Sequence, residues 1–263
     1  ERAILGDKWS QEDAVWNWRD DRLGKRQNFA QIKLLCENLM ARLKPLYFGA
    51  DSLPDEDRHS YEQFLLVILY HRYGDELEYA VENAIHGRGT ATRVPFYQDL
   101  CRDAESFLRD DEPSKKLLER LPALVALTFQ LRRGFYFILR SFIGGSEAAA
   151  RLRMSVWESC FTHDTKRYSR GLFDKMADIP TLIYGPSGTG KELVARCIGM
   201  SRYIPFDPVR ECFVKDFSQD FYPICLSALA SSVIESELFG HVKGAYTGAI
   251  GDRLGFFEVS GPY

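Results

Sequence analysis

The stretch "DIPTLIYGPSGTGKELVARCIG", residues 178–199, contains a short apolar run, a glycine-rich turn and an amphipathic run, in that order. Residues 181–184 are β-prone and predict a strand, and the apolar spacing after the turn predicts a helix that begins near residue 191. A strand, a glycine-rich loop and a helix together form the setting of a phosphate-binding loop. The stretch therefore predicts an α/β nucleotide-binding domain.

The glycine-rich turn offers a phosphate group both backbone amides and a cation. Its glycines let N–H groups converge on phosphate oxygens, and the helix N-terminus adds partial positive charge. Lys191 would reach the β- and γ-phosphates of ATP. Glu192 stands where the general pattern has the Ser or Thr that holds Mg²⁺, so the metal would have to be held differently. The predicted nucleotide-binding residues are Gly185, Pro186, Ser187, Gly188, Thr189, Gly190, Lys191 and Glu192.

The composition is that of a globular chain without a strong charge bias. Its 263 residues exceed the usual domain size of roughly 100 to 200 residues, so two domains are expected. The formal net charge of -3 gives no general attraction to nucleic acid or to anionic membranes. The six cysteines show neither a CxxC pair nor a metal-like spacing with histidine, which favours reduced thiols in a cytosolic protein and predicts no metal centre.

Two apolar runs, residues 64–70 and 121–143, predict buried helices and no membrane span. The first run is far shorter than the roughly 20 residues that a span requires. The second places Arg132 and Arg133 at its centre, where each charge costs about 2.5 to 3.5 kcal/mol on insertion scales.

Residues 1–145 predict a mostly α-helical region. Pro45 is expected to end or kink the first long helix, and Ser52 is expected to cap the next one, ahead of three acidic residues. The apolar residues of the first helix recur at spacings of three and four and predict its buried face: Phe29, Ile32, Leu35, Leu39 and Leu43.

A domain boundary is predicted near residue 145. Gly144 and Gly145 interrupt the preceding helical pattern, and Ser146 can cap a new helix. The predicted division is residues 1–145, a helical region, and residues 146–263, the α/β domain.

The segment "FYPICLSALASSVIESELFGHVKGAYTGAIGDRLGFFE", residues 221–258, predicts a second strand near residues 221–226. Ser232 followed by Glu235 forms a capping-box pattern that opens a helix, and Gly240 fits the C-terminal end of that helix. A loop of small residues around one tyrosine comes directly afterwards.

The motifs "GPSGTGKELVAR", "ESELFGH" and "GAYTGA", followed by "DRLGFFE", together resemble the AAA+ domain of bacterial sigma-54-dependent transcription activators. The resemblance covers about residues 150–263, and glutamate after the loop lysine is usual in that family. It implies a cytoplasmic ATPase that uses ATP and Mg²⁺ and forms a homo-oligomeric ring, a hexamer or heptamer. Such a ring engages sigma-54 and remodels the closed complex of RNA polymerase holoenzyme.

The resemblance also implies roles for particular residues. Tyr246 takes the place of the family's usual phenylalanine, and Cys225 takes the place of an asparagine that takes part, here with Glu237, in coupling the nucleotide site to the loop. Residues 203–217 exceed the family's usual length and are expected to form a surface excursion. The implied sigma-54 contact loop, called the contact loop below, consists of Gly244, Ala245, Tyr246, Thr247, Gly248 and Ala249.

By the same resemblance, the Walker B acids, sensors and arginine finger would follow Tyr263, as would a DNA-binding helix-turn-helix. The chain is therefore expected to be a truncated AAA+ domain without catalytic residues of its own, behind a regulatory or oligomerisation region of unknown type. Two alternatives stay open: an AAA+ ATPase that remodels another protein, and a nucleotide-gated scaffold that does not hydrolyse ATP.

Overall fold

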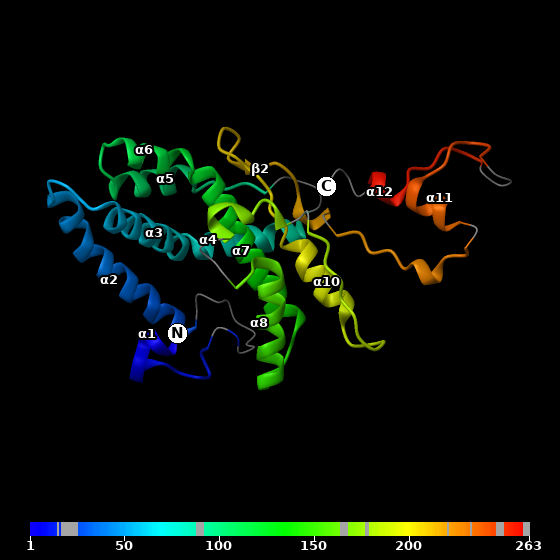
Figure 1. The fold of residues 1–263 in the computed structure, drawn as a ribbon, viewed down its shortest axis with the longest axis horizontal. Helices are drawn as coiled ribbons and strands as arrows, with labels where there is room; N and C mark the ends of the chain where they lie inside the picture. Colours follow the sequence, from blue (N-terminus) through cyan, green and yellow to red (C-terminus); the bar gives the residue numbers. More distant parts are fainter. Residues whose placement is uncertain are drawn as a thin grey trace.

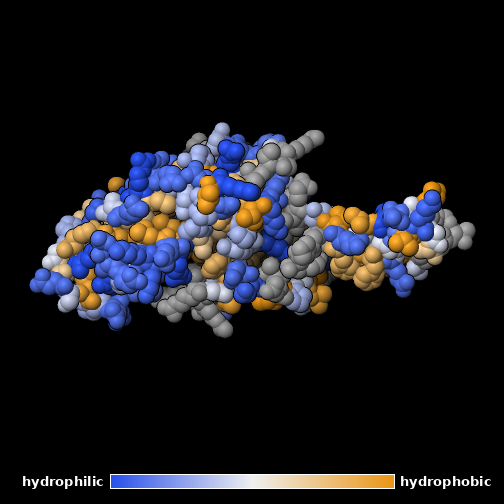
Figure 2. Space-filling model, turned by 90° about the horizontal axis from the view of Figure 1, so that it is seen from above, coloured by the Kyte–Doolittle hydropathy of each residue, from blue (hydrophilic) through white to orange (hydrophobic). Residues whose placement is uncertain are grey.

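The computed structural model describes residues 1–14, 16, 26–87, 92–163, 168–176, 179–219, 221–231, 233–245 and 250–259. Figure 1 shows a helical body, and a thin extended segment that leads from it to a small lobe with two short helices. The space-filling view in Figure 2 shows the same narrow lobe protruding from the body.

The body is built mainly from helices that precede residue 162. The central helix, α7, packs against α4, α8 and α10. The elements of this part are α1 (Arg2–Leu5), η1 (Gly6–Lys8), α2 (Gln27–Gly49), α3 (Asp55–Arg72), α4 (Gly74–His86), α5 (Tyr97–Ser106), α6 (Glu112–Glu119), α7 (Leu121–Ser141) and α8 (Glu147–Phe161).

The elements that follow are shorter and include one two-stranded sheet. They are the π-helix η3 (Tyr168–Leu172), α10 (Lys191–Met200), β1 (Phe206–Asp207), β2 (Cys212–Phe213), η5 (Phe217–Gln219), η6 (Leu226–Ala228), α11 (Ile234–Phe239) and α12 (Phe256–Val259). The elements that precede residue 162, described above, are all helices, which confirms the predicted mostly helical N-terminal region.

Helix α2 differs from its prediction in its buried face. The helix continues through Pro45 to Gly49. Leu35 and Leu39 are 41% and 44% exposed, whereas Met40 and Tyr47 are buried. The prediction was wrong for Leu35 and Leu39, because α2 packs mainly on α3 through a narrow strip in which the Tyr47 ring stacks on Tyr61 at 4.0 Å. Leu43 packs against the core, as predicted.

Two of the predicted helix starts can be compared with the structure. Ser146 caps α8, since its hydroxyl accepts from the amide of Ala149 at 3.2 Å, as predicted. Ser52 does not cap α3: the residue at the N-cap is Pro54, without a side-chain cap bond, although the three acids do occupy the first turn. The chain reaches Pro54 in an extended conformation, which leaves Ser52 ahead of the helix.

Helix α7 is buried, as its apolar sequence predicts. Arg132 and Arg133 are only 3% and 0% exposed, so both guanidinium groups lie inside the body. No helix in the described part of the chain is long and apolar enough to cross a membrane. All six cysteines lie among the described residues and are free, as expected for reduced thiols.

Residues 203–217 include a hairpin whose turn is exposed, with Val209 91% exposed, but whose phenylalanines are buried, so the expected surface excursion is right for the turn and wrong for the phenylalanines. β1 pairs antiparallel with β2, and Phe213 stacks on Phe129 of α7 with ring centres 4.0 Å apart. Phe206 lies 4.8 Å from the ring of Tyr97, and Phe217 is fully buried. Aromatic side chains of this size gain by leaving water, and the helical body supplies the apolar surface that receives them.

The two strands predicted at 181–184 and 221–226 are not formed. Leu182 and Tyr184 are 87% and 90% exposed, and neither segment pairs with a neighbour in the described residues. Parts of both line one hollow of about 850 Å³, so they face each other without hydrogen bonding. β-prone residues form a strand only when another strand satisfies their backbone groups, and here none does.

The packing crosses the predicted domain boundary near residue 145. One apolar core joins residues of α3, α4 and α7 to Met200, Ile204 and the hairpin phenylalanines. Arg153 of α8 is fully buried and donates to the carbonyls of Phe142 and Gly144. The boundary stays a prediction from the linear sequence.

Candidate functional site

The glycine-rich turn leads directly into α10. Gly190 stands at the helix N-cap with φ 83°, and Gly188 has φ 77°, both in the left-handed region that glycine adopts without a steric cost. The Thr189 hydroxyl donates to the Pro186 carbonyl at 2.8 Å and closes the turn. The predicted helix after the turn is confirmed and begins at Lys191, and the Gly190 carbonyl accepts from the amides of Leu193 and Val194 at 3.0 and 3.3 Å.

Lys191 folds back over the turn. Its Nζ donates to the carbonyls of Gly185 and Pro186, at 3.0 and 2.6 Å. Glu192 follows in the first turn of α10 and is exposed. The ammonium group therefore lies at the turn and is held there by neutral carbonyls, which are weaker partners for a cation than phosphate oxygens are.

Two buried side chains of α7 hold the C-terminal end of α10. Arg133 donates to the carbonyls of Met200 and Arg202, the first at 3.0 Å, and Gln130 donates to the carbonyl of Ser201 at 2.9 Å. These are carbonyls at and just beyond the end of the helix, where the helix dipole favours a cation. The helix that carries Lys191 is thus fixed at one end by the helical body.

The segment that contains the contact loop is pinched at its base. His241 and Arg253 exchange two backbone hydrogen bonds of 2.9 and 2.8 Å, and the amide of Lys243 donates to Asp252 Oδ1 at 2.7 Å. Gly244, with φ 84°, and Ala245 lie exposed just beyond this base. The other four predicted contact residues, Tyr246, Thr247, Gly248 and Ala249, lie outside the described residues.

An ion pair joins the base of the loop to α11. Arg253 donates to both carboxylate oxygens of Glu237, at 2.6 and 2.9 Å. Ser236 adds a hydrogen bond of 2.7 Å to the ring of His241. A bidentate pair fixes orientation as well as distance, so α11 and the strand-like base move as one unit.

The predicted helix before the loop is confirmed over Ile234–Phe239, with Gly240 at its C-cap at φ 78°. Its N-cap is Val233, and the predicted capping residue Ser232 lies outside the described residues. Figure 1 places α11 and α12 at the end of the extended segment, away from α10. The structure therefore does not bring the phosphate loop and the contact loop together.

The sequence of this region matches a known family. Residues 164–261 match the family described as the sigma-54 interaction domain. This segment includes every predicted nucleotide-binding and contact-loop residue, together with Cys225 and Glu237.

Related proteins agree over a shorter length. The anaerobic nitric oxide reductase transcription regulator NorR of Salmonella paratyphi C (strain RKS4594) is 48% identical over 84 residues. The proteins of the same name from Escherichia coli strains SE11 and K12 / DH10B are 46% identical over 84 residues. Each match spans 32% of this chain and 14% of the relative's length. No solved structure matches the chain.

Within the matched segment, Cys225 is exposed and its Sγ lies 3.4 Å from the Ser227 hydroxyl. Hydrogen bonds from Ser227 and from the amide of Ala228 lower the pKa of its thiol. No hydrogen bond or ion pair joins Cys225 to Glu237 in the described part of the chain, and the coupling of these two residues stays a prediction.

Sequence reasoning missed three residues that position the site: Gln130, Arg133 and Arg253. The signal for Arg133 was present, because the adjacent arginines Arg132 and Arg133 inside an apolar helix need buried acceptors. Gln130 carried no separate signal. Arg253 carried no comparable signal, since an arginine in a loop is ordinarily a solvated surface residue.

Proposed function

We propose that this chain supplies the nucleotide-binding and sigma-54-contacting parts of an ATP-dependent transcription activator. The observation that carries the proposal is the presence of the phosphate loop and the contact loop, in this order, within one sigma-54 interaction domain. The relatives named as transcription regulators support it over 84 residues. Because the match spans 14% of their length, the activity and partners of the whole protein are part of the proposal.

ATP binds at residues 185–192 in this proposal. The amides of the turn and of the first turn of α10 donate hydrogen bonds to the phosphate oxygens, and Lys191 exchanges its carbonyl partners for phosphate oxygens. No cluster of three His, Cys, Asp or Glu side chains that could hold a metal occurs among the described residues. The Glu192 carboxylate is an oxygen ligand of the kind Mg²⁺ prefers, and one such ligand suits a Mg²⁺ ion that arrives with the nucleotide phosphates.

In this proposal the contact loop binds sigma-54. The base formed by His241, Arg253 and Glu237 limits how the loop can move relative to α11. Tyr246 supplies an aromatic surface with a polar hydroxyl, and Thr247 supplies a second contact group. Subunits assemble into a ring, and ATP hydrolysis by the intact protein drives remodelling of the closed RNA polymerase complex.

One experiment tests both halves of the proposal. The intact protein is incubated with sigma-54 in ADP and aluminium fluoride, and captured sigma-54 is measured alongside ATP affinity. Thr247→Ala should retain ATP affinity and lose sigma-54 capture. Lys191→Ala should weaken ATP binding about tenfold or more, because it removes a charge-assisted phosphate contact worth roughly 1.5 to 3 kcal/mol.

Lys175→Ala serves as the matched control for the lysine, because Lys175 is an exposed side chain away from the turn. It should change neither readout. Unchanged sigma-54 capture by Thr247→Ala would refute the contact-loop assignment, and unchanged ATP affinity in Lys191→Ala would refute the phosphate-loop assignment.

A further inference from the structure

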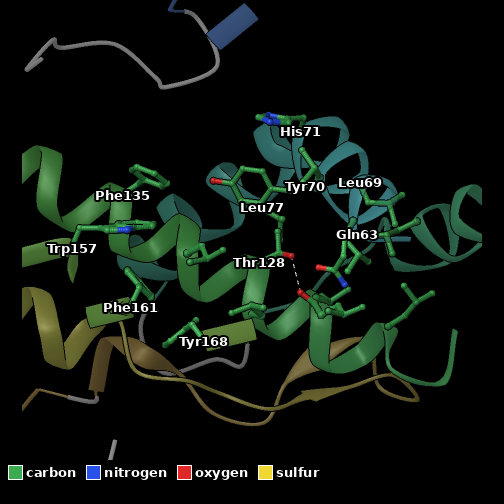
Figure 3. Close-up of a pocket in the computed structure, with 18 residues that line it drawn as sticks. Gln63, Leu69, Tyr70, His71, Leu77, Thr128, Phe135, Trp157, Phe161 and Tyr168 are labelled. Carbon is green, nitrogen blue, oxygen red and sulfur yellow. Dashed lines mark hydrogen bonds between the residues drawn. The ribbon is translucent and has the colours of Figure 1, made fainter. Parts of the chain in front are cut away.

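A hollow of about 440 Å³ lies in the helical body, and none of its lining residues belongs to the phosphate loop or the contact loop. Leu66, Val67 and Tyr70 of α3 form one wall and Leu124, Thr128 and Leu131 of α7 form the opposite wall. Figure 3 shows Phe135, Trp157, Phe161 and Tyr168 gathered at one end, where α8 and η3 meet α7.

A hollow of this size differs from ordinary packing. Protein interiors leave few voids larger than a water molecule, whereas ligand sites typically measure about 300 to 1,000 Å³. Here α3 and α7 stand apart over several turns and leave apolar side chains facing the space. Val67, at the rim, is 41% exposed, so the hollow is open to solvent there.

The lining of the hollow selects an uncharged ligand. Leucines and five Phe, Tyr or Trp residues dominate it, and none of the described side chains that line it is an Asp, Glu, Lys or Arg. Burial lowers the pKa of His71 to about 4, and the charges of Arg132 and Lys33 act in the same direction, so the imidazole is neutral near neutral pH. A charged ligand would lose its hydration without gaining an ionic partner.

The walls also carry polar atoms that lack partners. His71 Nδ1 is buried without a hydrogen bond. The Tyr168 hydroxyl is likewise buried without one; Gln130 lies near enough to affect its pKa, but the two side chains form no hydrogen bond of normal geometry. The Thr128 hydroxyl donates to the Leu124 carbonyl at 2.7 Å, shown as a dashed line in Figure 3, and can still accept. A ligand with a hydroxyl or carbonyl group would satisfy one of these atoms.

We propose that this hollow between α3 and α7 binds an uncharged, largely apolar small molecule that carries a hydroxyl or carbonyl group. The assignment is independent of sigma-54 contact and of nucleotide binding. The site nevertheless shares α7 with the phosphate-loop helix: Thr128 and Leu131 face the hollow, while Gln130 and Arg133 of the same helix hold the end of α10.

The test uses the neutral fluorescent probe N-phenyl-1-naphthylamine, titrated into the whole chain. The unsubstituted chain should bind one probe molecule per chain. Thr128→Trp fills the hollow and should weaken binding by about tenfold or more, because the occupied space is the site itself. Arg140→Trp places the same side chain at an exposed position of α7 that does not line the hollow, and this variant should bind the probe within about twofold of the unsubstituted chain.

Val67→Trp obstructs the hollow at its exposed rim, where a larger side chain does not disturb the core. If Thr128→Trp fails to fold, the probe affinity of Val67→Trp tests the proposal in its place. Val67→Trp too should weaken binding. Absence of probe binding by the unsubstituted chain, or equal affinity in the folded variants of Thr128 and Val67, would overturn the proposal.

Discussion

Gly240 and Gly255 cross at the base of the contact loop with no room for a side chain on either. A Cβ on Gly255 would lie 2.3 Å from the carbonyl carbon of Phe239 and 2.4 Å from the amide of Gly240. A Cβ on Gly240 would lie 2.5 Å from the carbonyl oxygen of Arg253. These are backbone contacts that cannot rotate away, so the loop base depends on both glycines.

Gly255→Ala should therefore open the base of the loop at a cost of about 1 to 3 kcal/mol, the usual range for overpacking. Limited proteolysis within residues 242–252 should become faster. Gly251→Ala is the matched control, because no atom lies within 4 Å of its Cβ position, and it should be cleaved at the unsubstituted rate. Equal cleavage of the two variants would show that the close crossing does not hold the loop.

His71 should make the stability of the helical body depend on pH. Its folded-state pKa of about 4 lies below the ordinary 6.5, mainly through burial, and Glu37 opposes the shift only in part. The unfolded chain therefore binds the proton more readily, and stability should fall as pH falls from about 6.5 toward about 4.

His71→Gln should flatten this loss when urea unfolding is compared at about pH 7 and about pH 5, since the variant has no imidazole to protonate. His59→Gln is the control, because His59 is exposed on the same helix and should leave the profile unchanged. A profile that is the same in all three proteins would contradict the burial of the neutral ring.

At the level of elements, the contact between α7 and α10 ties the phosphate loop to the helical body. Arg133 lies between the rings of Phe129 and Phe217, 5.0 Å from each ring centre, and its guanidinium donates to carbonyls at the end of α10. Its removal leaves buried acceptors without a donor, at roughly 1 to 3 kcal/mol.

Arg133→Met should accordingly lower the free energy of unfolding by about 1 to 3 kcal/mol, measured by urea denaturation. Arg140→Met, on the same helix but 57% exposed, should change it by less than about 1 kcal/mol, as an exposed ion pair does. An equal loss of unfolding free energy in the two variants would show that Arg133 does not hold α10.

The helix ends that are determined by a single capping residue could be predicted from the sequence. The starts of α8 and α10 and the end of α11 follow from Ser146, Gly190 and Gly240, which act within one turn. The strands at 181–184 and 221–226 failed because a strand needs a partner from elsewhere in the chain. The burial of the phenylalanines at 203–217 was misjudged because it depends on the helical body that receives them.

At the level of the whole molecule, α10, which follows the phosphate loop, belongs to the body, and α11 and α12, which flank the contact loop in the sequence, belong to the protruding lobe (Figures 1 and 2). The motif order in the sequence predicted both loops but not their separation in space. Phe239, Val242 and Ile250, in or near the lobe, are 67%, 68% and 87% exposed, so this end of the molecule presents apolar surface. Such surface commonly marks a site of protein contact.

The claim that residues 244–249 touch sigma-54 is tested most directly by placing a photoreactive benzoylphenylalanine at position 246. Irradiation with sigma-54 in ADP and aluminium fluoride should give a covalent adduct between the two proteins. The same group in place of Leu152, 44% exposed on α8, should give none. No adduct from position 246, or equal adducts from both positions, would contradict the account.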